Sequence, residues 1–237
     1  MNQQPITKAE KRSRSTLDVV SIFETIQGEG PFAGHPAVFI RLAHCNLQCP
    51  GCDTDYTSNA KQMTVYLIYN EVVERSPSAH HCSNFGVRDP LVVITGGEPF
   101  RQDIGPLCRV LVNNDFRVQV ETNGTLPPSE GLPEEVCVVC SPKTTLINHK
   151  LYTRADCFKY VLNYEDVDKD DGLPITALNH AVKGHVARPR DGVPIYVQPM
   201  DTKDPARDLL NIGAVITTCM KYNYILQLQT HKILKLP

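Results

Sequence analysis

Short apolar runs recur along the chain, and most of them lead directly into a polar motif that contains glycine or proline. Runs of this kind, rich in valine and isoleucine and bounded by turn-forming residues, are typical of buried strands. The last run alternates apolar and polar residues, which is typical of a half-buried strand. The pattern predicts strands at residues 19–23, 37–43, 91–95, 117–121, 136–140, 157–162, 195–200 and 224–230.

Helical patterns occupy several of the intervals between these strands, at residues 63–75, 104–114 and 205–222. Strands that alternate with helical or loop crossovers imply a parallel sheet, so the expected fold class is α/β. No internal repeat, linker or low-complexity block divides the chain. We therefore expect one domain over residues 18–237, preceded by a flexible, solvated N-terminal tail over residues 1–17.

The polar motifs at the strand exits are expected to share one site, because the carboxyl ends of parallel strands meet at one edge of a sheet. One strand also carries Arg41 inside its apolar run, and a buried guanidinium there would suit a carboxylate partner. The exit motifs are Cys52-Asp53-Thr54, Thr95-Gly96-Gly97-Glu98-Pro99, Glu121-Thr122-Asn123-Gly124-Thr125, Ser141-Pro142-Lys143 and Gln198-Pro199-Met200-Asp201.

Composition narrows the class of protein. The 237 residues are 41% hydrophobic and 21% charged, as in an ordinary globular domain, and a net charge of -2 gives no basic field for nucleic acid. No apolar run has the length of a membrane span or the character of a secretory signal, so we expect no contact with a membrane. Nine cysteines in such a chain predict a reducing, cytoplasmic location, with thiols kept for a metal or for catalysis.

Three of the cysteines, Cys45, Cys49 and Cys52, stand in one loop with the spacing C-x3-C-x2-C. Three thiolates on so short a loop can converge on a [4Fe–4S] cluster, in which the fourth iron would keep an open position for chemistry. The same cysteines with nearby His44 could instead close a structural zinc site, or could be small buried hydrophobic residues. The spacing alone leaves these interpretations open.

Together the motifs resemble those of the 7-carboxy-7-deazaguanine synthase family, within the radical S-adenosylmethionine superfamily. The resemblance runs from about residue 18 to the C-terminus, with nothing diagnostic at residues 76–89 and 166–190. It is carried by Ile26-Gln27-Gly28-Glu29-Gly30-Pro31, Phe39-Ile40-Arg41-Leu42-Ala43, Cys45-Asn46-Leu47, the motifs at the strand exits and the closing Gln229-Thr230-His231-Lys232.

The resemblance implies a partial (β/α) barrel of the radical S-adenosylmethionine type, with the site at the C-terminal ends of its strands, and a homodimer. It implies conversion of 6-carboxy-5,6,7,8-tetrahydropterin to 7-carboxy-7-deazaguanine by radical ring contraction with loss of ammonia, in queuosine or other 7-deazapurine biosynthesis. The implied cofactors are a [4Fe–4S] cluster, S-adenosylmethionine and Mg²⁺. The implied partner is an electron donor such as flavodoxin.

The resemblance also implies roles for individual residues. Cys45, Cys49 and Cys52 would each bind one iron, and Thr54 would give an oxygen to Mg²⁺. The S-adenosylmethionine site would be lined by Gly51, Cys52, Asp53, Gly97, Ser141, Pro142, Lys143, Gln198, Pro199, Met200 and Asp201. The pterin would face Ile26, Gln27, Gly28, Glu29, Arg41, Thr95, Glu121, His231 and Pro237, with Arg41 suited to its carboxylate.

Two other functions are compatible with parts of the sequence. A glycyl-radical activase also uses C-x3-C-x2-C, but it acts on a protein, and such a target gives no reason for the stretch from Ile26 to Pro31 or for the C-terminal ending. A zinc-stabilised binding module would use the same cysteines without catalysis. Reconstitution separates the zinc module from the other two, because it would bind zinc rather than iron and sulfide.

Overall fold

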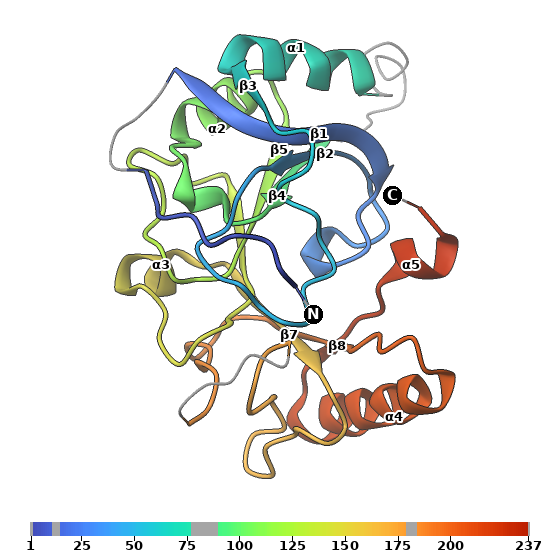
Figure 1. Ribbon diagram of the computed structural model, residues 1–237. Coiled ribbons are helices and arrows are strands. Elements are labelled where there is room, and N and C mark those ends of the chain that lie inside the picture. The colour runs from blue at the N-terminus through green and yellow to red at the C-terminus, as the bar shows by residue number, and fades with distance from the viewer. Residues whose placement is uncertain (1, 11–14, 77–89, 179–183, 237) are drawn as a thin grey trace.

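The computed structural model describes residues 2–10, 15–76, 90–178 and 184–236. Within these residues nine strands form one sheet, in the spatial order β3-β1-β2-β4-β5-β6-β7-β8-β9 (Figure 1). The strands are β1 (Thr16–Ile26), β2 (Pro36–Leu42), β3 (Lys61–Thr64), β4 (Leu91–Gly96), β5 (Arg117–Thr122), β6 (Cys137–Cys140), β7 (Cys157–Leu162), β8 (Ile195–Pro199) and β9 (Ile225–Leu226).

The sheet is parallel from β2 through β4 to β9, whereas β1 runs antiparallel to both of its neighbours, β2 and β3. Strands β3 and β9 form the two edges of this sheet, so the described part of the chain makes an open, partial barrel. The α/β class and the partial barrel expected from the sequence are confirmed. The carboxyl ends of the parallel strands all point to one edge, which is where the exit motifs lie.

In the described part of the chain, the helices before the C-terminal one lie around the outside of the sheet, and the C-terminal helix lies by its open side (Figure 1). Two of their boundaries have a clear local cause. The Asp204 side chain accepts hydrogen bonds from the first N–H groups of α4, and that helix ends at Asn223, which adopts the left-handed conformation (φ 58°). The helices are α1 (Val65–Arg75), α2 (Gly105–Val112), α3 (His149–Arg154), α4 (Pro205–Tyr222) and α5 (Thr230–Leu234), with 3₁₀ turns at Gly30–Phe32 and Pro99–Arg101.

Alternation along the parallel strands separates the core from the site. In β2, Ile40 and Leu42 are fully buried in the hydrophobic core, whereas Arg41 between them lines a cavity on the other face of the sheet. Strand β5 repeats the arrangement, with Val120 in the core and Glu121 at the cavity. One face of the sheet is therefore packed with apolar side chains, and the other presents polar ones near the strand exits.

The predicted elements are present, and β7 and α4 have the predicted bounds. The sequence pattern does not predict β3, α3 and α5, because each is too short to establish a period. The alternating run at 224–230 forms only the two-residue β9, because the chain turns into α5 directly after it. Both residues of β9 are exposed, so the alternation there does not mark a buried face.

The N-terminal segment differs from the solvated tail expected over residues 1–17. Strand β1 begins at Thr16, and residues 2–10, here called the N-terminal strap, lie against the cysteine loop. The Thr7 N–H donates to the Cys45 carbonyl oxygen (2.7 Å), and Ile6 pairs with Cys45 in a parallel bridge. The hydrogen-bond partners that order this strap lie far away in the sequence, so local composition does not reveal them.

Two further findings bear on the sequence analysis. None of the helices within the described ranges combines the length and the apolar character needed to span a membrane. The predicted substrate residue Pro237 lies outside the described residues, as does almost all of the undiagnostic stretch 76–89.

Candidate active site

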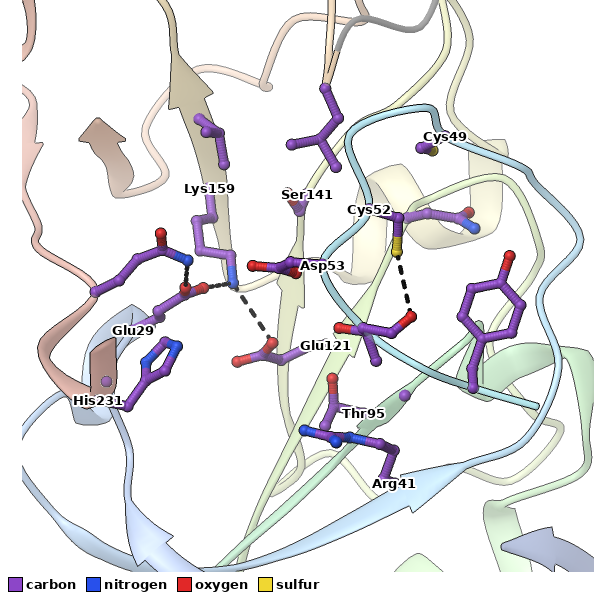
Figure 2. A pocket seen from close by; sticks show the side chains of 18 of the residues that line it. Glu29, Arg41, Cys49, Cys52, Asp53, Thr95, Glu121, Ser141, Lys159 and His231 are labelled. Atoms are coloured by element: carbon purple, nitrogen blue, oxygen red, sulfur yellow. Dashed lines mark hydrogen bonds and ion pairs between the residues drawn. The ribbon is translucent and has the colours of Figure 1, made fainter. Parts of the chain in front are cut away.

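A cavity of about 320 Å³ opens on the polar face of the sheet, at the strand exits (Figure 2). Its wall takes residues from β1, β2, β4, β5, β7 and β8 and from the loops that follow them. The cysteine loop (45–54) bounds one side, and the C-terminal segment from Gln229 to Lys232 bounds the opposite side. The exit motifs that are far apart in the sequence therefore meet around one space.

The three cysteines of the loop all line this cavity as free thiols. The Leu47 N–H donates to Cys45 Sγ (3.4 Å), and the Asn123 side-chain amide lies 4.0 Å from the same sulfur. Burial raises the pKa of the Cys45 thiol to about 12, so a cation must displace its proton at neutral pH. Three convergent thiols with N–H donors beside them are a donor set that fits an iron–sulfur cluster.

The same region does not form a compact site for a single ion. In the described part of the chain, no three His, Cys, Asp or Glu side chains come together closely enough to hold one metal ion. A [4Fe–4S] cluster makes no such demand, because each thiolate binds a different iron. His44, the fourth ligand of the zinc interpretation, does not line the cavity. The donor set therefore fits the cluster better than tetrahedral zinc.

Gly96 and Gly97 allow the cysteine loop to start against the end of β4. A Cβ at Gly97 would lie 1.8 Å from the His44 carbonyl oxygen, and a Cβ at Gly96, where φ is +121°, would lie 2.2 Å from the Leu42 carbonyl oxygen. No side chain fits at either position. Sequence analysis assigned Gly97 to the cofactor; it does line the cavity, and loop packing is a second reason for glycine there.

Glu98 follows these glycines and is fully buried. Its carboxylate accepts hydrogen bonds from Thr122 Oγ1 (2.7 Å), the Asn123 N–H (2.7 Å) and the Phe100 N–H (3.1 Å). Burial nevertheless raises the pKa of this carboxyl group to about 6. Asn123, held in this way, donates to Asn46 Oδ1 (3.0 Å), so Glu98 indirectly ties the β5 exit to the cysteine loop.

On the side of the cavity expected to take S-adenosylmethionine, two polar groups are prominent. Lys143 Nζ donates to the carbonyl and hydroxyl oxygens of Ser141 (2.9 and 2.5 Å), and burial lowers the pKa of this ammonium group. Gln198 Oε1 is buried without a hydrogen-bond partner. A buried acceptor without a partner is costly, so a donor from a bound ligand would satisfy it.

Lys232 of α5 connects the C-terminal segment to the side of the cavity expected to take S-adenosylmethionine. Its ammonium group donates to Asp53 Oδ2 (2.7 Å) and lies 3.4 Å from Asp201 Oδ2. Asp53 belongs to the cysteine loop and Asp201 follows β8, so three distant segments meet here. The two aspartates expected at the cofactor are thus already paired with a lysine of the chain.

Arg41 reaches the cavity from β2 without an ion-pair partner among the described residues (Figure 2). Its guanidinium lies 5.1 Å from the centre of the Phe23 ring, and its Nε is buried with no acceptor. Burial lowers the pKa of this group, and the more distant Asp53 and Asp55 only partly oppose that effect. Thr95 stands opposite Arg41 in the neighbouring strand, so both face the same part of the cavity.

A buried lysine lies between two glutamates across the cavity from Arg41 (Figure 2). Lys159 of β7 forms ion pairs with Glu29 and with Glu121, the latter at 3.4 Å. Gln27 Nε2 donates to Glu121 Oε1 (3.0 Å), and Gln229 Nε2 donates to Glu29 Oε1 (2.7 Å). The polar residues of the β1 exit loop are thus held by the sheet and by the C-terminal segment together.

His231 of α5 packs directly on the β1 exit loop. A Cβ at Gly28 would lie 2.2 Å from His231 Nδ1, so only glycine permits this contact. The contact brings the imidazole to the cavity wall beside Glu29.

Thr54, the residue expected to bind Mg²⁺, lines the cavity at the end of the cysteine loop. Its carbonyl oxygen accepts a hydrogen bond from Gln4 Nε2 of the N-terminal strap (2.9 Å). Gln4 Oε1 in turn accepts from the Tyr56 N–H (2.8 Å). The Gln4 amide therefore pairs with the loop backbone as a neighbouring strand would.

Most residues expected at the site are gathered at the cavity, but Pro142 and Pro199 are not among its lining residues. Those that line it are Ile26, Gln27, Gly28, Glu29, Arg41, Cys45, Cys49, Gly51, Cys52, Asp53, Thr54, Thr95, Gly97, Glu121, Ser141, Lys143, Gln198, Met200, Asp201 and His231.

Lys159, Asn123, Gln229 and Lys232 also line the cavity, and none of them was expected there from the sequence. Lys159 carries a signal of the same kind as Arg41, because it is a cation inside an apolar run. The other three stand in motifs that the sequence analysis quoted, but their partners come from other strands and loops. Nothing local to those motifs identifies these contacts.

Known proteins match the chain over most of its length. The 7-carboxy-7-deazaguanine synthase of Rhodospirillum rubrum is 40% identical over 227 residues, which cover 93% of each chain. The enzyme of the same name from Rickettsia prowazekii is 38% identical and covers 92% of this chain and 88% of its own. That of Escherichia coli is 32% identical and covers 91% of this chain and 96% of its own.

Among solved structures, the crystal structure of QueE from Escherichia coli is similar, with a TM-score of 0.61 and 23% identity. The match covers 91% of this chain and 94% of that chain, and it supports the fold described above. No family model matches the chain.

Proposed function

Because this chain belongs to the 7-carboxy-7-deazaguanine synthase family, we propose that it converts 6-carboxy-5,6,7,8-tetrahydropterin to 7-carboxy-7-deazaguanine. The reaction is a radical ring contraction with loss of ammonia, and its product serves queuosine biosynthesis. Relatives that are 32–40% identical over about nine-tenths of the chain support this conclusion. The cavity supports this conclusion, because three free thiols and a guanidinium group whose Nε lacks an acceptor line the same space.

As a member of that family the chain uses a [4Fe–4S] cluster and S-adenosylmethionine. When bound, these groups supply a carbon-centred radical that removes a hydrogen atom from the substrate. Cys45, Cys49 and Cys52 are the cluster ligands of this proposal. The polar residues assigned to S-adenosylmethionine are Ser141, Lys143, Gln198, Asp53 and Asp201, with Gly51, Gly97 and Met200 completing that wall.

The opposite wall is assigned to the pterin. The Arg41 guanidinium lines the cavity and would pair with the substrate carboxylate, and Thr95 stands beside it. Glu29 and Glu121 would accept hydrogen bonds from N–H groups of the ring. Ile26, Gln27, Gly28 and His231 would hold the ring in place and exclude water from the reacting atoms.

Mg²⁺, the electron donor and the cellular location complete the proposal. Thr54 would give one oxygen to a Mg²⁺ ion whose other ligands come from substrate and water, as this hard cation prefers. A low-potential donor such as flavodoxin would deliver the electron. The eight free cysteines of the described residues suit the reducing cytoplasm, where thiols stay available for the cluster.

We further propose that two copies of the chain associate through the outer face of α4. Leu209, Ile212, Ile216 and Met220 follow helical spacing along this face, and all are exposed, Met220 by 83%. An apolar stripe of this length on a helix normally packs against something. A second copy of the same stripe is the occupant that we assign to it.

Anaerobic turnover tests the proposed function. Reconstituted protein with reductant, S-adenosylmethionine and carboxytetrahydropterin should release 7-carboxy-7-deazaguanine. Cys49→Ala should lose cluster iron and turnover, whereas Cys108→Ala, a buried cysteine of α2, should keep its iron. Thr54→Ala should keep the cluster but lose the stimulation of turnover by Mg²⁺.

Three results would contradict the assignment. Full iron content in Cys49→Ala would show that the cluster ligands are wrongly assigned. Cleavage of S-adenosylmethionine without any deazaguanine would point to a different substrate. Stoichiometric zinc in place of iron and sulfide would favour the binding module.

A further inference from the structure

Lys159 is the most unusual side chain of the sheet. It lies in the apolar strand β7, between fully buried Phe158 and nearly buried Tyr160, yet alternation turns it to the cavity side. Only 6% of its surface is exposed. Lysine is almost never buried to this extent unless it is paired, so its partners should explain its position.

Those partners are the two carboxylates of the pterin wall. Burial alone would raise the pKa of Glu29, but the Lys159 ammonium, with smaller effects of Gln229 and His231, outweighs it, so the pKa falls to about 2. Burial alone would lower the pKa of Lys159, but Glu121 and Glu29 outweigh it, so the pKa rises. Both pKa shifts indicate that at neutral pH Lys159 is a charged ammonium group between ionised carboxylates.

The hydrogen bonds leave each carboxylate with capacity for a ligand. Glu29 accepts from Lys159, Gln198 and Gln229. Glu121 accepts from the same lysine and from Gln27 and Gln119. A carboxylate offers roughly four acceptor positions, so about one remains on each. Both glutamates line the cavity, where a bound ring can reach that position.

We propose that Lys159 is a positioning residue that holds Glu29 and Glu121 as paired hydrogen-bond acceptors for the N–H groups of the substrate ring. This inference rests on the proposed function, because it takes the occupant to be a pterin, whose aminopyrimidinone edge presents N–H donors. The lysine itself need not touch the substrate. Its positive charge keeps both glutamates ionised, so that they accept hydrogen bonds from the ring.

The physical reason lies in what two neighbouring carboxylates do without a cation. In a dry site they cannot both stay ionised, so one takes up a proton. A protonated carboxyl group then offers an O–H donor where the ring also offers donors. The substrate would have to displace that proton in order to bind.

Among the described residues, Lys159 is the cation that forms ion pairs with both glutamates. Lys143 donates to Ser141, and His231 lies beside Glu29 and helps to lower the pKa of that carboxyl group. The thiols of Cys137 and Cys157 also interact with Lys159 or Glu121, and burial raises the pKa of each. Neutral thiols provide no counter-charge.

The test compares Lys159→Met, Lys159→Arg and the double variant Lys159→Met/Glu121→Gln with the wild type. Binding of 6-carboxypterin, a stable fluorescent analogue with the same edge and carboxylate, is titrated between pH 5.5 and 7.5. Cluster iron and melting temperature are recorded for each protein, because the variants must remain folded.

Lys159→Met should bind at least about 30-fold more weakly at the acidic end, since a buried charge has lost its partner. Its affinity should rise by up to tenfold per pH unit, because one proton leaves when the ligand binds. The wild type and Lys159→Arg should lack this pH slope. The double variant should lack it too, because it has no shared proton, and it remains informative if Lys159→Met does not fold.

Wild-type affinity with no pH slope in a folded Lys159→Met protein would overturn the inference, as would a pH slope in the double variant. Failure of the wild type itself to bind the carboxypterin would instead count against the proposed function. The two failures are therefore distinguishable.

Discussion

Arg41 belongs to a core strand, but its side chain faces the cavity. Its neighbours in β2 are core residues, and its own side chain faces the cavity with an unpartnered Nε and the Phe23 ring beneath it. The structure thus keeps a desolvated guanidinium ready for an anion, at a cost that a bound carboxylate would offset.

We expect Arg41→Ala to raise the dissociation constant of carboxytetrahydropterin by at least about 30-fold, because the substrate carboxylate loses its buried partner. Arg41→Lys should recover part of the loss, since lysine keeps the charge but not the two-pronged geometry. Tetrahydropterin, which lacks the carboxylate, is the control ligand. It should bind the wild type and Arg41→Ala about equally, and a large difference would mean that Arg41 serves the fold instead.

At the scale of elements, the N-terminal strap and α5 enclose the site from two sides. The strap pairs with the cysteine loop through backbone hydrogen bonds and the Gln4 amide, and it continues to the turn after β4, where the Glu10 N–H donates to the Arg101 carbonyl oxygen (2.8 Å). Helix α5 is joined to the same loop by the Lys232–Asp53 ion pair. The cysteine loop is therefore supported by both ends of the chain.

This support predicts an effect of Gln4→Ala, even though Gln4 is remote from the thiols in sequence. The variant loses the acceptor for the Tyr56 N–H and the donor for the Thr54 carbonyl. Amide hydrogen exchange at Tyr56 in the cluster-free protein should become about tenfold faster, as expected for one lost hydrogen bond. Iron should also be lost to a chelator more quickly.

Gln3→Ala is the matched control, because Gln3 is the neighbouring residue of the same type and is exposed. It should change neither the exchange rate nor the loss of iron. Equal behaviour of the two variants would mean that the strap is not held by Gln4. By the same reasoning a tag fused to the N-terminus, which a free tail would tolerate, should disturb the cysteine loop.

At the scale of the molecule, helix α4 has two different faces. Its inner face, with Val215 and Cys219, is buried in the core, whereas its outer face carries the exposed apolar stripe. The residues of that stripe are not part of the hydrophobic core. An exposed apolar stripe of this kind is typical of a contact with another chain.

We expect the double substitution Leu209→Lys/Met220→Lys to convert a dimer to a monomer without loss of fold, because it places charges at the centre of an apolar contact. Sedimentation of the wild type and the variant gives the two masses. Leu67→Lys on α1 is the control, since Leu67 is also an exposed leucine on a helix. A monomeric wild type, or a variant that stays dimeric, would show that α4 is not the dimer interface.

The sequence by itself determined the class of the fold and the polar motifs at the strand exits. Buried parallel strands are continuous apolar runs, and their exits are marked by glycine, proline and polar residues, so both are visible locally. The spacing of Cys45, Cys49 and Cys52 belongs to one loop, and Arg41 stands out in its strand. These signals depend only on neighbours in the chain.

The tertiary structure alone decided which of these groups meet. The pairing of Lys159 with Glu29 and Glu121 joins β7 to β5 and to the exit of β1, and the contact of Gln4 with Thr54 joins residues fifty positions apart. Such contacts follow from strand order and register, which result from packing the whole core rather than from any local pattern. For the same reason the sequence predicts a free tail for the N-terminal strap, whereas in the folded protein the cysteine loop and the turn after β4 hold it in place.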